Sequence, residues 1–261
     1  MTATDKATVQ HTLQYTLRLA DDALVLGHRL SEWVSHGPLL EEDIALANTA
    51  LDYVGRARLF YGYAAQISTE QLSDSKTEDD LAYLRDERDY QNHLLLELPI
   101  GDFAFTMARQ FLCDTYQWHY LQALAQSSDK TLAAIAEKAF KETRYHLRRS
   151  REWVLRLGDG TEESHRRTQT AFNQLWDYIV ELFEVDALER ELIERGVAVN
   201  PAEFKTQWLK DISEVLTEAT LTVPTTEHAI RGGRQGYHTE NLGHLLTAMQ
   251  FVHRSYPNCE W

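Results

Sequence analysis

Apolar residues recur every three or four positions along almost the whole chain, which is the spacing that puts them on one face of an α-helix. The pattern predicts helices over residues 13–36, 40–67, 81–98, 103–121, 132–153, 168–183, 187–194, 201–221 and 239–254. No stretch of the sequence alternates apolar and polar residues as a half-buried strand would. The sequence therefore predicts an all-α protein.

Two long helical hairpins are predicted, over residues 13–67 and 103–153, joined by a crossover at 68–101. Two hairpins and a crossover are typical of a ferritin-like four-helix bundle. We expect that bundle, with additional C-terminal helices packed around its outside. Residues 1–12 are polar and are predicted to form a tail, which leaves 13–261 as a single ferritin-like helical domain.

Acidic residues on the four bundle helices are the first candidates for chemistry. Ferritin-like di-iron proteins use one Glu from each of two helices and a Glu-x-x-His pair from each of the other two. Asp22 and Asp52 lie equally far along the chain from the first predicted turn, at Gly37, and Asp114 and Glu142 lie equally far from the second. Because a helix rises by a constant amount per residue, we expect these acids at a common level of the bundle.

The histidines of a di-iron site are missing at the required spacing. Gly55 stands three residues after Asp52, and Tyr145 stands three residues after Glu142. The one literal Glu-x-x-His run in the sequence, at residues 162–165, is predicted to lie in a polar loop and to be solvated. A missing ligand usually means a missing metal ion.

Three interpretations of the acids follow, and spacing alone leaves them open. In the first, the chain has a working but unusual iron site with five ligands: Asp22, Asp52, Asp114, Glu142 and His146. In the second, this is the remnant of such a site, with no metal expected, and the carboxylates are held by hydrogen bonds or by ion pairs with arginines such as Arg56, Arg109 or Arg144. In the third, they are ordinary helix acids whose matching depth is coincidence.

Composition narrows the possible partners. The formal net charge of −14 argues against binding to nucleic acid or to an anionic membrane, since both need clustered Lys and Arg. No run approaches the ~20 apolar residues of a membrane span, and the first residues lack the apolar core of a signal peptide. The two cysteines, Cys113 and Cys259, suggest neither a disulfide framework nor a thiolate metal site. A cytoplasmic location is expected.

Several runs, taken in order, resemble one protein family. They come from both hairpins, the crossover and the C-terminal part: Leu17-Arg18-Leu19-Ala20-Asp21-Asp22, Asp43-Ile44-Ala45-Leu46-Ala47-Asn48, Gly55-Arg56-Ala57-Arg58, Arg85-Asp86-Glu87-Arg88, Lys141-Glu142-Thr143-Arg144-Tyr145-His146 and His238-Thr239-Glu240-Asn241-Leu242-Gly243. From about Leu13 to Trp261, the chain resembles the structural C subunits of phenylacetyl-CoA 1,2-epoxidase (ring 1,2-phenylacetyl-CoA monooxygenase). No single run is diagnostic, but their order and spacing together are specific.

The resemblance implies a non-catalytic subunit of a complex that inserts one oxygen atom into the aromatic ring of phenylacetyl-CoA during phenylacetate degradation. It implies that the di-iron site belongs to a homologous catalytic subunit, which this chain would pair with and stabilise. Electrons would come from NADPH through a reductase subunit with a flavin and an iron–sulfur cluster, and small accessory subunits would complete the complex. No cofactor is expected in this chain itself.

Two rival functions remain. One is the active di-iron oxygenase or ferroxidase of the first interpretation. The other is a module that binds a CoA ester, with Arg231-Gly232-Gly233-Arg234-Gln235-Gly236 as a candidate phosphate cradle. This run lacks the preceding strand and the spacing of a phosphate loop. A structural loop before a helix capped by Thr239 is therefore favoured.

Overall fold

The computed structural model describes residues 3–257 and 259. Among these residues, ten α-helices and four 3-10 helices form and no strand occurs, so the predicted all-α class is confirmed. The chain divides into two compact units. Unit 1 combines Met1–Pro99 with Gly232–Trp261, and unit 2 is Ile100–Arg231. The assignment of 13–261 to a single domain stays a prediction.

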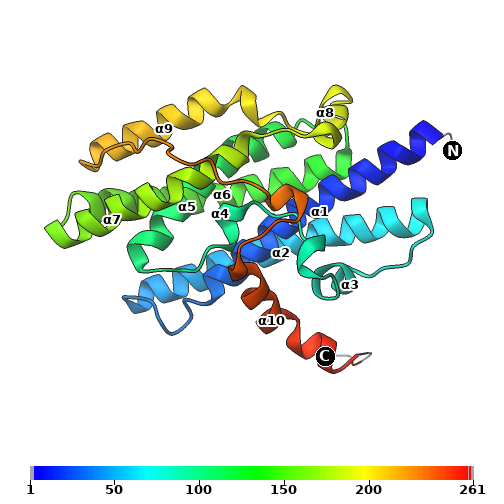
Figure 1. Cartoon of the computed structure of the whole chain (residues 1–261), viewed down its shortest axis with the longest axis horizontal. Coiled ribbons are helices and arrows are strands. Elements are labelled where there is room, and N and C mark those ends of the chain that lie inside the picture. Colours follow the sequence, from blue (N-terminus) through cyan, green and yellow to red (C-terminus); the bar gives the residue numbers. More distant parts are fainter. Residues whose placement is uncertain (1–2, 258, 260–261) are drawn as a thin grey trace. The chain divides into compact units, whose positions relative to one another are not determined.

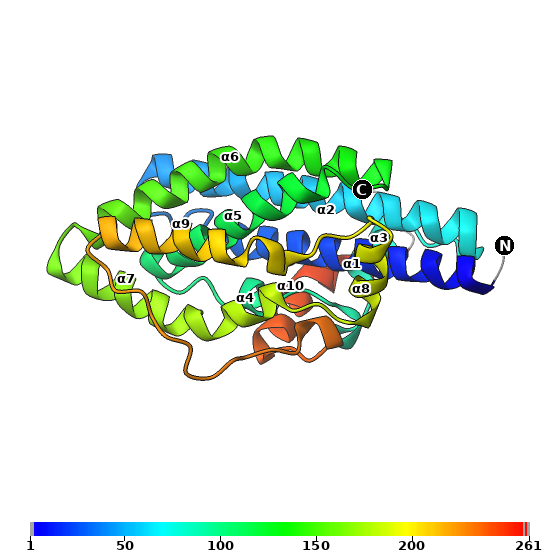
Figure 2. The same ribbon diagram turned by 90° about the horizontal axis from the view of Figure 1, so that it is seen from above.

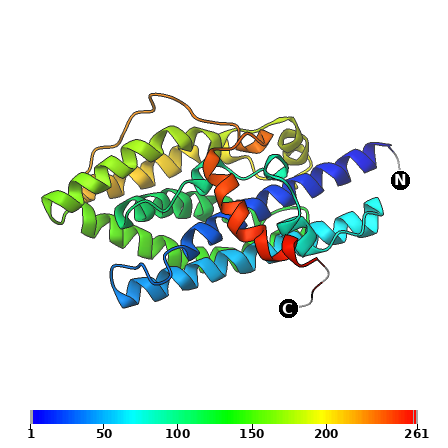
Figure 3. The same ribbon diagram turned by 60° about the horizontal axis from the view of Figure 1, so that its bottom comes forward.

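Unit 1 is built on a hairpin of two long helices, α1 (Ala3–Ser31) and α2 (Leu40–Leu72), which lie side by side in Figures 1 and 3. Helix α1 begins at Ala3, before the predicted helix start at Leu13, and the assignment of residues 1–12 to a polar tail outside the domain stays a prediction. Extending an existing helix adds one hydrogen bond for each residue fixed, so a polar sequence can continue it without an apolar face.

The crossover is the largest departure from the predicted helices. The expected helix over 81–98 is replaced by α3 (Glu78–Tyr83), a 3-10 turn (Glu87–Asp89) and the single turn α4 (Leu94–Glu97). The backbone N–H of Gln91 donates to Asp21, and that of His93 donates to Asp22. These amides are bound to carboxylates of α1, so they are not available for the hydrogen bonds of a continuous helix.

The last helix of the chain, α10 (Glu240–Ser255), belongs to unit 1 and contacts α1, α3 and α4. Figure 3 shows it running across α1. The glycine run before it forms a tight turn, with positive φ angles of 141° at Gly232 and 74° at Gly236. Thr239 occupies the N-cap position as predicted, but its side chain makes no capping hydrogen bond.

Unit 2 contains the second hairpin, α5 (Phe103–Leu124) and α6 (Lys130–Gly158). Helices α7 (Glu162–Leu175) and α9 (Lys205–Glu218) contact both, and Figure 2 shows these helices running beside the hairpin. Asp102 and Asp129 cap α5 and α6 through hydrogen bonds to the first free backbone amides. The hairpins α1–α2 and α5–α6 are the elements that a ferritin-like bundle requires.

The rest of unit 2 is shorter helices. Two predicted helices are partly 3-10 in form, over Trp176–Phe183 and Pro201–Glu203, while α8 (Ala187–Glu194) has the predicted limits. The Glu-x-x-His run at 162–165 is the first turn of α7, capped by Thr161, and not the loop that was predicted. Because a Thr side chain accepts from the helix amides, the helix starts before the first apolar residue.

The aromatic core of unit 2 surrounds Trp208 of α9, which is fully buried. The Phe183 ring meets the Trp208 ring edge-on with centroids 5.2 Å apart, and Phe204 and Tyr116 pack against Phe183. The Trp208 indole N–H donates to the backbone oxygen of Leu112 at 3.2 Å, which ties α9 to α5. Edge-on ring pairs add stabilisation beyond the apolar area that they bury.

Candidate functional site

Asp22, the first predicted ligand, lies in a buried ion pair of unit 1. Its side chain is 7% exposed. Both of its oxygens accept from the Arg234 guanidinium, at 3.1 and 2.8 Å, and the backbone amide of His93 donates to it at 2.8 Å. Burial alone would raise the pKa of Asp22, but the charge of Arg234 and the bonds from His93 outweigh it and hold the pKa well below its usual range.

The neighbouring Asp21 forms a second buried cluster, which was not predicted from the sequence. Its side chain is fully buried and paired with the guanidinium of Arg85. The Tyr61 hydroxyl donates to it at 2.5 Å, and the Gln91 amide donates at 2.9 Å. Burial, reinforced by the negative charge of Asp21, raises the pKa of the Tyr61 hydroxyl well above its usual value. Tyr61 therefore remains a neutral donor.

Glu97 of α4 forms a third cluster. Its fully buried carboxylate accepts from Asn92 at 2.8 Å, from His238 at 2.7 Å and from the backbone amide of Thr239 at 2.6 Å. The second ring nitrogen of His238 faces the backbone oxygen of Tyr90 at 2.8 Å. Burial alone would lower the pKa of His238, but Glu97 raises it above the ordinary value, because only a protonated ring can donate to both acceptors.

Each of these three carboxylates is thus neutralised by a cation of the protein. Arg85 comes from the crossover, and Arg234 and His238 come from the segment before α10. These cations connect parts of unit 1 that lie far apart in sequence. The local sequence does not mark most of this network, so its other members were not predicted: Asp21, Arg85, Glu97 and His238. A usable signal was the Asp21–Asp22 pair, which lies inside an apolar stripe.

The glycine run at 231–236 serves this network. A side chain at Gly233 would collide with the backbone of Asn92, and one at Gly236 would collide with the backbone of Arg88. The two glycines let the segment approach the crossover closely enough for Arg234 to reach Asp22. The geometry therefore supports the structural interpretation of this loop over the phosphate cradle.

Asp52 and Gly55 lie on α2, and Asp52 is partly exposed. A Cβ atom added at Gly55 would have no other atom within 4 Å. The position where a Glu-x-x-His pair places its imidazole therefore has neither a side chain nor a contact that would replace one.

In unit 2, Asp114 is 1% exposed and accepts from the Ser150 hydroxyl at 2.8 Å. Across the same hairpin, the rings of Trp118 and Phe140 pack with centroids 4.3 Å apart. The expectation that Asp114 and Glu142 share one level stays a prediction.

The remaining predicted residues lie on α6. Glu142 is partly exposed, His146 is 2% exposed, and Tyr145 is exposed. Of the arginines expected to hold the acids, Arg56 and Arg109 are buried and Arg144 is exposed. The cation bound to Asp22 is Arg234, which was not among them.

The arrangement of these side chains decides whether they could hold iron. The described residues contain no group of three or more His, Cys, Asp or Glu side chains placed to hold a metal ion. Asp22 would have to give up two guanidinium bonds before it could bind one, which would leave Arg234 buried without its anion. The predicted ligand set therefore does not fit a di-iron centre.

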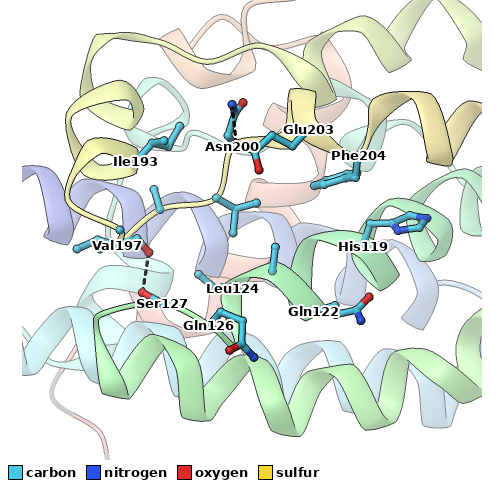
Figure 4. A pocket seen from close by; sticks show the side chains of 14 residues that line it. His119, Gln122, Leu124, Gln126, Ser127, Ile193, Val197, Asn200, Glu203 and Phe204 are labelled. Carbon is cyan, nitrogen blue, oxygen red and sulfur yellow. Dashed lines mark hydrogen bonds between the residues drawn. The ribbon is translucent and has the colours of Figure 1, made fainter.

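A separate cavity of about 490 Å³ lies in unit 2, where the loop after α5 meets the segment after α8. Figure 4 shows its polar lining, which includes Gln122, Gln126 and Asn200, beside the ring of Phe204. The Ser127 hydroxyl donates to the backbone oxygen of Val197 at 2.7 Å and ties the two segments together. None of the five predicted ligands lines this cavity.

Within the part of the chain that the structure describes, no helix has the length and apolar character needed to cross a membrane.

Comparison with known proteins agrees with the resemblance found in the sequence. The family model described as "Phenylacetic acid catabolic protein" matches residues 1–261. The C subunit of 1,2-phenylacetyl-CoA epoxidase from Escherichia coli (strain K12) is 46% identical over 247 residues, which cover 95% of this chain and 98% of that protein. The chain belongs to the phenylacetic acid catabolic protein family.

Proposed function

We propose that this chain is the structural, non-catalytic subunit of a phenylacetyl-CoA 1,2-epoxidase complex that acts in phenylacetate degradation. The observation that carries the proposal is the 46% identity to the C subunit of such an enzyme, along nearly the full length of both chains. A match of that extent, with two long helical hairpins, favours the same place in the same kind of complex.

The non-catalytic role is supported by the condition of the candidate ligands. The Asp22 carboxylate is bound by Arg234 through both oxygens, so a guanidinium lies where a ligand would meet its metal. Gly55, at the position of a ligating histidine, supplies no imidazole. A buried carboxylate that is paired with an arginine or histidine side chain has a structural role, because removing either partner leaves an uncompensated charge.

In the proposed division of labour, the di-iron site and the CoA-ester pocket belong to a homologous catalytic subunit. Electrons reach that subunit from NADPH through a reductase with a flavin and an iron–sulfur cluster. This chain pairs with the catalytic subunit and stabilises it. Its own residues do no proton or oxygen chemistry in this scheme.

The test is turnover of phenylacetyl-CoA by the catalytic subunit and reductase, with and without this chain, followed by NADPH oxidation and epoxide formation. Turnover is expected only when this chain is present. Normal turnover by the catalytic subunit without it would contradict the proposal.

A variant of this chain separates the structural role from a catalytic one. Glu142→Ala removes the candidate ligand on α6 that is already partly exposed. The proposal predicts unchanged turnover of the assembled complex, whereas a working iron site in this chain predicts a strong loss. The melting temperature of the variant shows whether any loss comes from unfolding.

A further inference from the structure

One side of α2 carries an exposed apolar surface. We define the α2 outer face as Leu40, Ile44, Leu51 and Leu59, which are 73%, 53%, 68% and 38% exposed. Val34 and Leu39, in the turn before α2, are exposed as well and extend it. These residues make up half of the large exposed apolar side chains in the described part of the chain. Apolar surface gathered in this way is typical of an interaction site.

Most exposed positions on this part of α2 are uncharged. Among the exposed positions from Leu40 to Leu59, only Glu41 and Arg58 are charged. On the last turns of the same helix, the exposed positions are polar or charged. The exposed positions of α6, a helix of similar length, are mostly Lys, Arg and Glu. The apolar surface is therefore specific to the first two thirds of α2.

The middle of the face has a glycine. Gly55 lies between Leu51 and Leu59 on this side, and a Cβ atom added there would meet no other atom within 4 Å. A glycine flanked by leucines leaves a depression in which a side chain from another helix can sit against the backbone. From Leu40 to Leu59 the face is about 30 Å long, at ~1.5 Å per residue. That length fits a long helix better than a short peptide.

Charge indicates which helix can occupy the face. The first turn of α2 contains Glu41, Glu42 and Asp43 beside the exposed leucines. A second copy of this chain would bring a further net charge of −14, and a large net charge of one sign on both partners opposes association. The complementary occupant has an apolar helix with basic side chains facing residues 41–43.

We propose that the α2 outer face is the docking surface for the catalytic subunit of the epoxidase, which covers it with a long apolar helix flanked by basic residues. This inference rests on the proposed function. A stable interface buries about 800 Å² on each partner, which exceeds one helix face, so the turn with Val34 and Leu39 belongs to the same contact.

The experiment measures binding of purified catalytic subunit to immobilised full-length chain, as wild type, Leu51→Glu and Ile44→Glu. Both substitutions lie at exposed positions, so the melting temperature is expected to change little. Gln66→Glu is the matched control, since it adds the same charge at an exposed position of α2 beyond the face. The affinity is expected to fall about 30-fold or more in Leu51→Glu, as for a central interface residue, and to stay at the wild-type value in Gln66→Glu.

The other outcomes are distinguishable. If wild type binds and Leu51→Glu binds equally well, the inference is wrong and the proposed function stands. If wild type itself does not bind the catalytic subunit, the proposed function fails and the inference fails with it. Sedimentation of the isolated chain measures its oligomeric state. A dimer that Leu51→Glu converts to a monomer would assign the face to a second copy and overturn the inference.

Discussion

The two units stabilise their long hairpins by different chemistry. Unit 1 buries Asp21, Asp22 and Glu97, each paired with a cation from a distant part of the chain. Unit 2 is centred on Trp208 and the aromatic rings around it. Removing the cation of a buried ion pair leaves an uncompensated charge, whereas an aromatic cluster distributes its stabilisation over many contacts. We therefore expect unit 1 to be destabilised most by the removal of a single buried charge. Unit 2 should be destabilised most by the removal of buried side-chain volume.

The largest expected effect is that of Arg234→Met. It leaves the Asp22 carboxylate buried without its cation, which costs about 3–5 kcal/mol of the free energy of unfolding. Urea unfolding measures it. Adding Asp22→Asn should recover part of the loss, because the uncompensated charge is then gone.

Arg231→Met is the control for that prediction. Arg231 lies in the same loop and pairs with Glu184, but both side chains are exposed. It should change stability by less than about 1 kcal/mol, as for other surface ion pairs. If Arg231→Met and Arg234→Met lowered the free energy of unfolding equally, the buried pair of unit 1 would stabilise the protein no more than a surface ion pair does.

In unit 2, the corresponding change is Trp208→Ala. It removes a fully buried indole and its hydrogen bond to Leu112, and about 3 kcal/mol is expected to be lost. Trp208→Phe keeps most of the ring volume and should lose clearly less. If both variants unfold at the same urea concentration, the hydrogen bond matters and the packing does not, which contradicts the comparison.

A smaller effect is expected for Ser150→Ala in α6. It removes the hydroxyl that donates to the buried Asp114, and a buried acceptor left without a donor costs about 1–3 kcal/mol. Ser213→Ala is the control, because the Ser213 hydroxyl bonds only to a backbone oxygen of its own helix. A loss no greater than that of the control would mean that the hydrogen bond from Ser150 to Asp114 does not stabilise unit 2.

The smallest expected effect is a pH dependence from His238. Its folded pKa is raised, so its stabilising contribution is fully present below the unfolded pKa of about 6.5 and is lost as pH rises through the folded value. Asp22, whose folded pKa is lowered, contributes above its unfolded pKa of 3.8 and loses that contribution only at lower pH. The two groups therefore act in separate pH ranges.

Urea unfolding between pH 6 and about pH 9 tests this prediction. The difference in stability between wild type and His238→Asn should shrink as pH rises, because only wild type has the imidazolium to lose. A difference that stays constant across this range would mean that His238 is not charged in the folded protein.

The sequence predicted the helices that local pattern determines. The apolar spacing gave the all-α class, both hairpins and the limits of α8, Ala187–Glu194. The crossover could not be predicted in this way, because the amides of Gln91 and His93 are bound by carboxylates 70 and 71 residues earlier. Long-range hydrogen bonds of this kind leave no periodic trace in the sequence.

The candidate site was predicted less completely. Asp22 and Asp114 were selected from the sequence, and both are buried with polar partners. Arg234 and Ser150 were not predicted as those partners, since that depends on the path of the loop before α10 and on the register of α6.

The most direct test of the central claim is the iron content of this chain after anaerobic incubation with ferrous iron and removal of the excess. We expect a value near zero, because Arg234 holds the Asp22 carboxylate and the histidine positions are not filled. About two iron ions per chain, as in working di-iron bundles, would contradict it and make this chain a catalytic subunit.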